Sequence, residues 1–268
     1  MKKLFYLFGI CCSFIFISCE EDIALDFDET VPRLVIEANI FEEEDLVRII
    51  LSTTTNFYSD VFPKVDGAEV QIKNLETNEI YMFMNSGAGN YITSNIDFQN
   101  GISYELTVIY NNESYKAVST PLKAPEVINI GQINDGGILG DSYEFQFYFQ
   151  DNPDQENYYL TQAISPIDHS FGVLNDEFTN GNLMNDVYFY DKEDLKSGDR
   201  LDYFINSIDK NYYNYLSKLF SISGSGSNPF ASPMGTIKGN IINQTKEDNY
   251  ALGYFHIAKR NHYTYIVK

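Results

Sequence analysis

Hydrophobic and polar residues alternate along much of the chain, and this pattern predicts β-strands. From Leu34 onward every second residue is apolar, so one side of the segment would face a core and the other solvent. The alternation resumes in segments that begin at Ala68, Ile80 and Tyr104. Turn residues divide these segments at a spacing of about 8–12 residues, which is typical of a β-sandwich. We therefore expect a mainly β fold that begins with an immunoglobulin-like β-sandwich over residues 33–122.

One segment of this sandwich carries a more specific signal. The run from Gly101 to Val108 has the form Gly-x-x-Tyr-x-Leu-x-Val, with Tyr104 as its tyrosine. It resembles the strand of immunoglobulin-like and fibronectin-like modules that carries a corner tyrosine, whose hydroxyl bonds back to the upstream backbone. The resemblance implies that Tyr104 is such a corner residue.

The second half of the chain is also predicted to be β-rich. Pro121 and Pro125 interrupt strand pairing, so we place a domain boundary between residues 122 and 123. Residues 123–268 then form a second β-rich domain, sandwich or barrel-like, with one helix. That helix is expected near residues 207–220, where apolar residues recur at steps of three and four and Ser207 is placed to cap. The last strands are expected near residues 236–242, 250–257 and 263–267.

The N-terminus has the features of a bacterial lipoprotein signal. A short basic start precedes an apolar-to-small run from Leu4 to Ile17, which is too short for a membrane-spanning helix of about 20 residues. The run ends in Phe16-Ile17-Ser18-Cys19, which resembles the bacterial lipobox, with Phe16 in place of the usual leucine. We expect residues 1–18 to be a lipoprotein signal peptide and Cys19 to be lipidated. The alternative is an ordinary secretory signal with a chance cysteine.

Lipidation of Cys19 would anchor the protein to membrane lipid without spanning the bilayer, because several acyl chains together hold firmly. Residues 19–32 are interpreted as an acidic tether. Their Glu20-Glu21-Asp22 cluster resembles the surface-export signal of Bacteroidota lipoproteins, and the alternative is a solvated acidic linker. No later apolar run of about 20 residues occurs, so the rest is expected to be a soluble body. We expect a lipid-anchored protein of the outer membrane that faces the cell surface, with the periplasmic face as the alternative.

Composition narrows the choice of partners. The chain has 38 acidic and 18 basic side chains, and its formal net charge is −20. Nucleic-acid phosphates select basic surfaces, so a nucleic-acid partner is not expected. Of the three cysteines, Cys11 and Cys12 would leave with the signal peptide and Cys19 would become the anchor. No free thiol would then remain for a disulfide, a zinc–thiolate site or a cysteine nucleophile.

No catalytic constellation is recognisable, so we predict no catalytic, cofactor-binding or metal-binding residue. The three histidines, His169, His256 and His262, do not form a metal-binding helical pair. Neither a Gly-x-Ser-x-Gly elbow nor a P-loop occurs. Residues 151–157 gather oxygen ligands that calcium would accept, but they lack the glycine and terminal glutamate of an EF-hand. A plain turn is favoured there, and calcium binding by a carboxylate cluster is left open.

Aromatic residues are abundant, with 21 Tyr, 20 Phe and no Trp. Most are expected in the core and across strand pairs, while surface tyrosines could stack on a ligand or on a partner. A glycine- and serine-rich loop carries Asn228-Pro229-Phe230. This motif is interpreted either as a partner-docking element or as a plug for the protein's own sheet edge.

Several short segments, taken in order, resemble a known protein family. They are residues 32–37, 53–58 and 65–70 in the first half and 228–233, 239–241 and 251–255 in the second. Behind a lipobox, this order is similar to an uncharacterised Bacteroidota lipoprotein family, domain of unknown function 4249. The resemblance implies an outer-membrane lipoprotein associated with TonB-dependent transporters that import nutrients. It implies no established enzyme activity.

On this basis we expect a non-enzymatic, lipid-anchored accessory or substrate-capturing partner of a TonB-dependent nutrient transporter, with its ligand unidentified. Two alternatives come from other functional classes. One is a surface hydrolase that acts on glycan or peptide, and the other is a structural or adhesive surface protein. The choice among them rests on family association and not on a residue constellation.

Overall fold

The fold is mainly β-structure with one α-helix, in a computed structural model that describes residues 31–41, 46–56, 59, 61–225 and 235–268. The predicted fold class is therefore confirmed. No helix in the described part of the chain has both the length and the apolar character needed to cross a membrane.

The first seven strands form a sandwich of two layers. They are β1 (Leu34–Phe41), β2 (Leu46–Thr53), β3 (Glu69–Asn74), β4 (Ile80–Gly87), β5 (Asn90–Ser94), β6 (Tyr104–Tyr110) and β7 (Glu113–Ser119). In hydrogen-bonding order, β1, β2 and β5 make one layer and β4, β3, β6 and β7 make the other, while the β4–β5 pair joins the two. This three-plus-four arrangement is that of fibronectin type III sandwiches. Ile36, Ile49 and Leu106 are fully buried in the shared core.

Tyr104 occupies the corner position that its sequence run predicts. It begins β6 and is fully buried. Its hydroxyl accepts a hydrogen bond from the backbone N–H of Gln99 at 2.9 Å and donates to the carbonyl of Asp97 at 3.4 Å. Phe98 packs edge-on against its ring, with centroids 4.9 Å apart. The predicted corner tyrosine is confirmed, and it fixes the loop that precedes the strand.

A second sandwich repeats the strand order of the first. Its strands are β8 (Val127–Gly136), β9 (Ser142–Gln150), β10 (Tyr158–Ile164), β11 (His169–Asn175), β12 (Leu183–Asp191), β13 (Arg200–Ile208) and β16 (Asn261–Ile266). One sheet has the order β12-β9-β8, and the other has the order β11-β10-β13-β16. The core is aromatic, and Phe147 stacks on Tyr203 with ring centroids 3.9 Å apart. Of the two predicted forms, the second domain is a sandwich.

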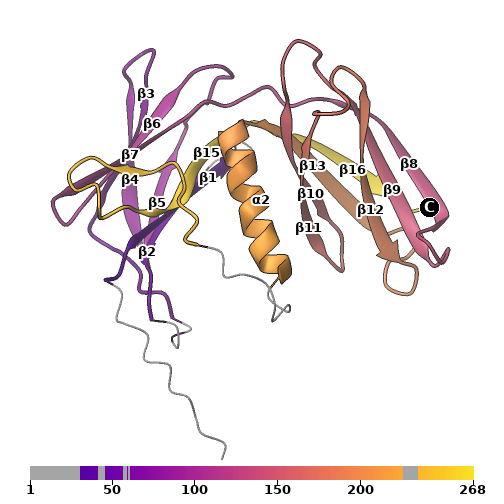
Figure 1. Ribbon diagram of the computed structural model, residues 1–268, viewed down its shortest axis with the longest axis horizontal. Coiled ribbons are helices and arrows are strands. Elements are labelled where there is room, and N and C mark those ends of the chain that lie inside the picture. The colour runs from indigo at the N-terminus through magenta and orange to yellow at the C-terminus, as the bar shows by residue number, and fades with distance from the viewer. Residues whose placement is uncertain (1–30, 42–45, 57–58, 60, 226–234) are drawn as a thin grey trace, which may run out of the picture. The chain divides into compact units, whose positions relative to one another are not determined.

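A long insertion between β13 and β16 returns to the first sandwich (Figure 1). It contains α2 (Lys210–Ser225), β14 (Ile242–Asn243) and β15 (Leu252–Ala258). β15 pairs in parallel with β1, and β14 pairs in antiparallel with β7. Ile241, Ala251, Phe255 and Ile257 of this insertion are buried in the core of the first sandwich. Two strands from beyond residue 123 thus complete the first sandwich, and the boundary at residues 122–123 stays a prediction.

The prediction of a strand near residues 236–242 is wrong. Only Ile242–Asn243 form ladder bonds there. The backbone of Gly239 instead lies directly against that of Gly253, and Asn240 bonds to β15 through its side chain. The segment therefore follows β15 without becoming one of its strand partners.

The single predicted helix is present, but its cap is not Ser207. Ser207 lies in β13, and its hydroxyl donates to the carbonyl of Lys123 at 2.9 Å. The cap is Asp209, whose carboxylate accepts from the backbone N–H groups of Asn211 at 2.8 Å and Tyr212 at 3.0 Å. The helix consequently begins at residue 210 and runs past the predicted end at residue 220.

Candidate functional site

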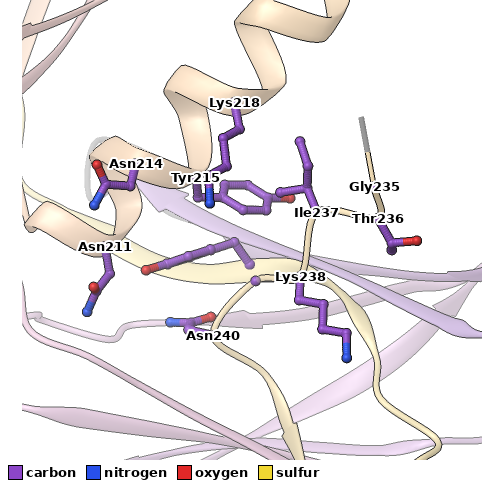
Figure 2. A pocket seen from close by; sticks show the side chains of 11 residues that line it. Asn211, Asn214, Tyr215, Lys218, Gly235, Thr236, Ile237, Lys238 and Asn240 are labelled. Carbon is purple, nitrogen blue, oxygen red and sulfur yellow. The ribbon is translucent and has the colours of Figure 1, made fainter. Parts of the chain in front are cut away.

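A cavity of about 810 Å³ lies between α2 and the segment 235–240 (Figure 2). Its walls are one face of the helix, the irregular segment and Tyr254 of β15. Small-molecule sites typically have volumes of roughly 300–1,000 Å³. We therefore treat this cavity as the candidate ligand site.

The helix α2 has two faces of different character. Tyr212 and Leu216 are buried and pack against Leu160 and Ile208 of the second sandwich. The other face lines the cavity with residues at helical spacing: Asn211, Asn214, Tyr215 and Lys218. Figure 2 shows these four side chains projecting from the helix. The apolar stripe of the helix is the stronger signal in the sequence, and the polar face that lines the cavity was not predicted, although its residues recur at helical spacing.

The opposite wall depends on close backbone packing. A Cβ atom on Gly239 would lie 1.7 Å from the carbonyl oxygen of Gly253, so only glycine fits there. Gly253 has a positive φ of +95°, and a Cβ atom on it would lie 2.0 Å from the carbonyl oxygen of Ile36. The segment, β15 and β1 therefore approach one another backbone to backbone. This packing fixes the wall against the first sandwich.

Asn240 joins the same wall to β15 by hydrogen bonds. Its side-chain Nδ2 donates to the carbonyl of Phe255 at 2.9 Å, and its Oδ1 accepts from the N–H of Phe255 at 2.9 Å. Nδ2 also donates to the carbonyl of Val118 at 3.4 Å. Asn240, Phe255, Gly239 and Gly253 all belong to segments that carried the family resemblance. Their role in the structure is to build and hold the cavity wall.

Aromatic rings contact one another at the base of the cavity. The rings of Tyr215 and Tyr254 have centroids 4.8 Å apart. Tyr212 contacts Tyr254 at 4.6 Å and stacks on His256 at 4.1 Å. Burial raises the pKa of both Tyr215 and Tyr254 above the usual value for a phenol. Both hydroxyls therefore stay protonated at neutral pH and can donate as well as accept hydrogen bonds.

The cavity carries positive charge in a strongly acidic protein. Among the described residues, its lining includes Lys218 and Lys238 and no carboxylate. Within the described residues, neither lysine forms an ion pair. Lys238 Nζ lies 3.8 Å from the centroid of the Tyr250 ring, and the Arg33 guanidinium lies 3.7 Å from the same centroid. The Arg33 guanidinium is thus a third cation close to the wall that contains Lys238.

The residues predicted for lipidation and docking, Cys19 and Asn228-Pro229-Phe230, lie outside the described residues. The three histidines lie on three different strands. His169 is exposed at the start of β11, and His262 of β16 contacts Asp202 at 2.7 Å. His256 is buried in β15, and this burial lowers its pKa to about 3, so the ring is neutral.

The segment weighed as a calcium loop, residues 151–157, has its two buried polar side chains, Asp151 and Asn157, hydrogen-bonded within the protein. Asp151 is buried and accepts hydrogen bonds from the hydroxyl of Tyr159 and from the N–H of Gly181. The side chain of Asn157 donates to the carbonyl of Asn152 at 2.7 Å. In the part of the chain that the structure describes, no group of three or more His, Cys, Asp or Glu residues is placed to hold a metal ion.

The fold and the site together define a class of protein, a tandem β-sandwich protein with a polar cavity of small-molecule size. The chain belongs to the family described as a domain of unknown function, DUF4249, whose sequence profile matches residues 20–264. The match covers both sandwiches and the insertion, and it confirms the resemblance to domain of unknown function 4249. No curated protein matches the chain.

Several solved structures are similar to this chain. The FN1–FN3 domains of chicken CNTN1 share 11% identity with a TM-score of 0.28, covering 68% of this chain and 62% of that one. This chain therefore spans about three-fifths of the CNTN1 fragment. A segment of two fibronectin type III domains from chicken tenascin shares 12% identity with a TM-score of 0.22, covering 66% of this chain and 91% of that one. For the chicken interferon gamma receptor alpha chain the identity is 11%, the TM-score 0.21, and the coverage 66% and 88%.

Proposed function

We propose that this protein is a non-enzymatic, lipid-anchored protein of the outer membrane that captures a ligand beside a TonB-dependent nutrient transporter. The observation that carries the binding role is the cavity beside α2. Amide, phenol and ammonium groups converge on it from the helix, the segment 235–240 and β15. A few convergent polar groups in a cavity of this size are the usual means of ligand recognition.

The N-terminal sequence supports the anchoring part of the proposal. Cys19 stands at the end of a lipobox-like run, and residues 20–33 separate it from the first strand. A fully extended chain covers about 3.3–3.6 Å per residue, so this tether reaches at most about 50 Å. The body would then search the membrane surface around its anchor. The acidic Glu20-Glu21-Asp22 cluster supports placement on the cell surface.

Hand-over to a transporter is the proposed mechanism. Anchoring confines both partners to one membrane and raises their effective concentration for each other. Asn211, Asn214 and Lys218 are exposed, so water competes for each contact they make with a ligand. Exposed polar contacts of this kind favour exchange of the ligand over tight retention.

Substitution of the anchor cysteine tests the localisation. Cys19→Ala removes the acylated thiol, and we expect the protein to leave the membrane fraction of fractionated cells. Cys11→Ala and Cys12→Ala are matched controls within the same signal region, and both variants should stay membrane-bound. Retention of Cys19→Ala on membranes would refute lipid anchoring. Digestion of the protein by added protease in intact cells would test its exposure at the surface.

Affinity capture tests the partner. Native membranes are solubilised mildly, the tagged protein is captured, and the co-purifying proteins are identified by mass spectrometry. We expect a TonB-dependent transporter among them. If no transporter is captured even after chemical cross-linking, the transporter part of the proposal fails.

A further inference from the structure

We propose that the cavity beside α2 binds a small anionic sugar, meaning a hydroxyl-rich ring that bears a carboxylate or a phosphate group. This inference rests on the proposed binding function and names the class of ligand. Three features of the lining carry it, which are its charge, its free hydrogen-bonding groups and its aromatic base.

The charge of the lining favours an anion. Acidic side chains outnumber basic ones by 38 to 18 in the chain, yet the lining, as far as the structure describes it, has two lysines and no acidic residue. Lys218 comes from the helix and Lys238 from the facing segment. An anion that enters the cavity would therefore meet the Lys218 ammonium on the helix wall. The Lys238 ammonium lies over the Tyr250 ring and would reach the anion from the facing wall by leaving that ring.

The hydrogen-bonding groups of the lining match hydroxyls. The side chains of Asn211, Asn214 and Thr236 line the cavity, and none of them has a hydrogen-bond partner within the described residues. An amide offers both donors and acceptors, as a sugar hydroxyl does, so each amide can serve a hydroxyl in either role. The lining thus provides free neutral partners beside its two cations.

The aromatic base suits the apolar faces of a sugar ring. Tyr215 and Tyr254 both line the cavity and meet at an interplanar angle of 46°. Tyr254 is buried, so the ring surface that a ligand can reach is that of the partly exposed Tyr215. After burial, the carboxylate of Glu37 raises the pKa of Tyr215 and that of Asp209 raises the pKa of Tyr254. Both phenols are held as neutral donors, which can bond to sugar oxygens. A cavity of about 810 Å³ has room for a ligand larger than one ring.

Calorimetric titration tests the ligand class. The protein used is the Cys19→Ala variant, which lacks the lipid and leaves the cavity unchanged. The ligands titrated into it are trigalacturonate, glucose 6-phosphate, neutral maltotriose and inorganic phosphate. We expect saturable binding of trigalacturonate or glucose 6-phosphate at least about ten-fold tighter than binding of maltotriose or inorganic phosphate. Comparison of the first two probes separates a carboxylate from a phosphate ligand. Added salt should weaken the binding of the anionic probes and leave the binding of maltotriose unchanged.

Variants of the two lysines locate the binding. Lys218→Gln and Lys238→Gln should each lower the affinity for the anionic probe about ten-fold. Lys73→Gln on β3 removes the same charge away from the cavity and should leave the affinity unchanged. Thermal unfolding of each variant confirms that it is folded before it is titrated.

Three results would overturn the inference. These are equal affinity for neutral and anionic probes, absence of saturable binding of either anionic sugar, and an effect of Lys73→Gln as large as that of the cavity variants. A transporter that co-purifies with the protein while no anionic sugar binds would leave the proposed function standing and remove only this assignment of the ligand.

Discussion

Asn240 and Phe255 exchange two hydrogen bonds in opposite directions, both 2.9 Å long, between a side-chain amide and a backbone. Phe255 is fully buried in the first sandwich, whereas Asn240 belongs to the wall of the cavity. The pair therefore couples the shape of the cavity to the core of a domain that is distant in sequence. The amide takes the place of a strand partner at this point of β15.

Removal of this amide should destabilise the protein. Asn240→Ala leaves the buried N–H and carbonyl of Phe255 without their partner, and we expect a loss of about 1–3 kcal/mol in the free energy of unfolding. Asn214→Ala is the control, because Asn214 is exposed and should change stability by less than about 0.5 kcal/mol. Urea unfolding followed by circular dichroism measures both. Equal stability of the two variants would show that the exchange of bonds contributes nothing.

Alanine at either of the packed glycines should be more damaging. A methyl group on Gly239 or Gly253 would overlap a carbonyl oxygen, at 1.7 Å and 2.0 Å respectively, and backbone cannot move aside as a flexible side chain can. We expect each variant to lose at least about 2 kcal/mol of stability or to fail to fold. At Gly235 an added Cβ would meet nothing within 4 Å, so Gly235→Ala serves as the control. Thermal melting of all three variants decides the matter, and a Gly239→Ala protein as stable as the control would contradict the close approach.

The first sandwich should not fold without the insertion. A fragment of residues 33–122 lacks β14 and β15, and with them the buried side chains of Phe255 and Ile257. Each such side chain contributes about 1.5–3 kcal/mol through burial, and β1 would be left as an open edge. We expect the fragment to show poor dispersion in its NMR spectrum and no cooperative unfolding, in contrast to the full chain. Cooperative unfolding with native-like dispersion would instead support the boundary predicted at residues 122–123.

Acidification should lower the stability of the protein through protonation of His256 in the unfolded state. Burial lowers the pKa of this histidine to about 3 in the folded state, while the unfolded chain takes up the proton near pH 6.5. Between these two values the unfolded state binds more protons, so the free energy of unfolding falls as the pH falls below about 6.5. At pH 5 we expect a loss of about 1–2 kcal/mol from this group relative to pH 7.5. Urea midpoints at both pH values should show a smaller drop in His256→Gln, and an unchanged drop would exclude His256 as the cause.

Local patterns in the sequence predicted much of the fold. The alternation of Leu34, Ile36 and Ala38 correctly identifies the buried face of β1, because a strand that is half buried shows its periodicity directly. The run around Tyr104 also predicts its corner role. The second sandwich repeats the first without a visible sequence repeat. A positive-φ glycine precedes both Tyr104 and Leu201 by three residues, but Leu201 stands where the tyrosine would be recognised.

The cavity could not be predicted in the same way, because its parts meet over long separations. Gly253 lies against Ile36, which is more than 200 residues away in the sequence, and the local sequence pattern does not predict this contact. The polar face of α2, with Asn211 and Lys218, was readable from helical spacing alone. The facing wall, formed by the segment 235–240, could not be predicted, because Asn240 bonds to β15 through its side chain and the segment shows no strand pattern.

The parallel pairing of β1 with β15 has a mechanical consequence. β1 is the first strand of the chain. It is bonded on one side to β2 and on the other, from Val35 to Phe41, to β15. Tension applied along the strand from a lipidated N-terminus would load both ladders in shear, so that their bonds resist together instead of breaking one after another. The insertion from the second sandwich thereby reinforces β1, the strand at which a force applied through the N-terminal residues would enter the fold.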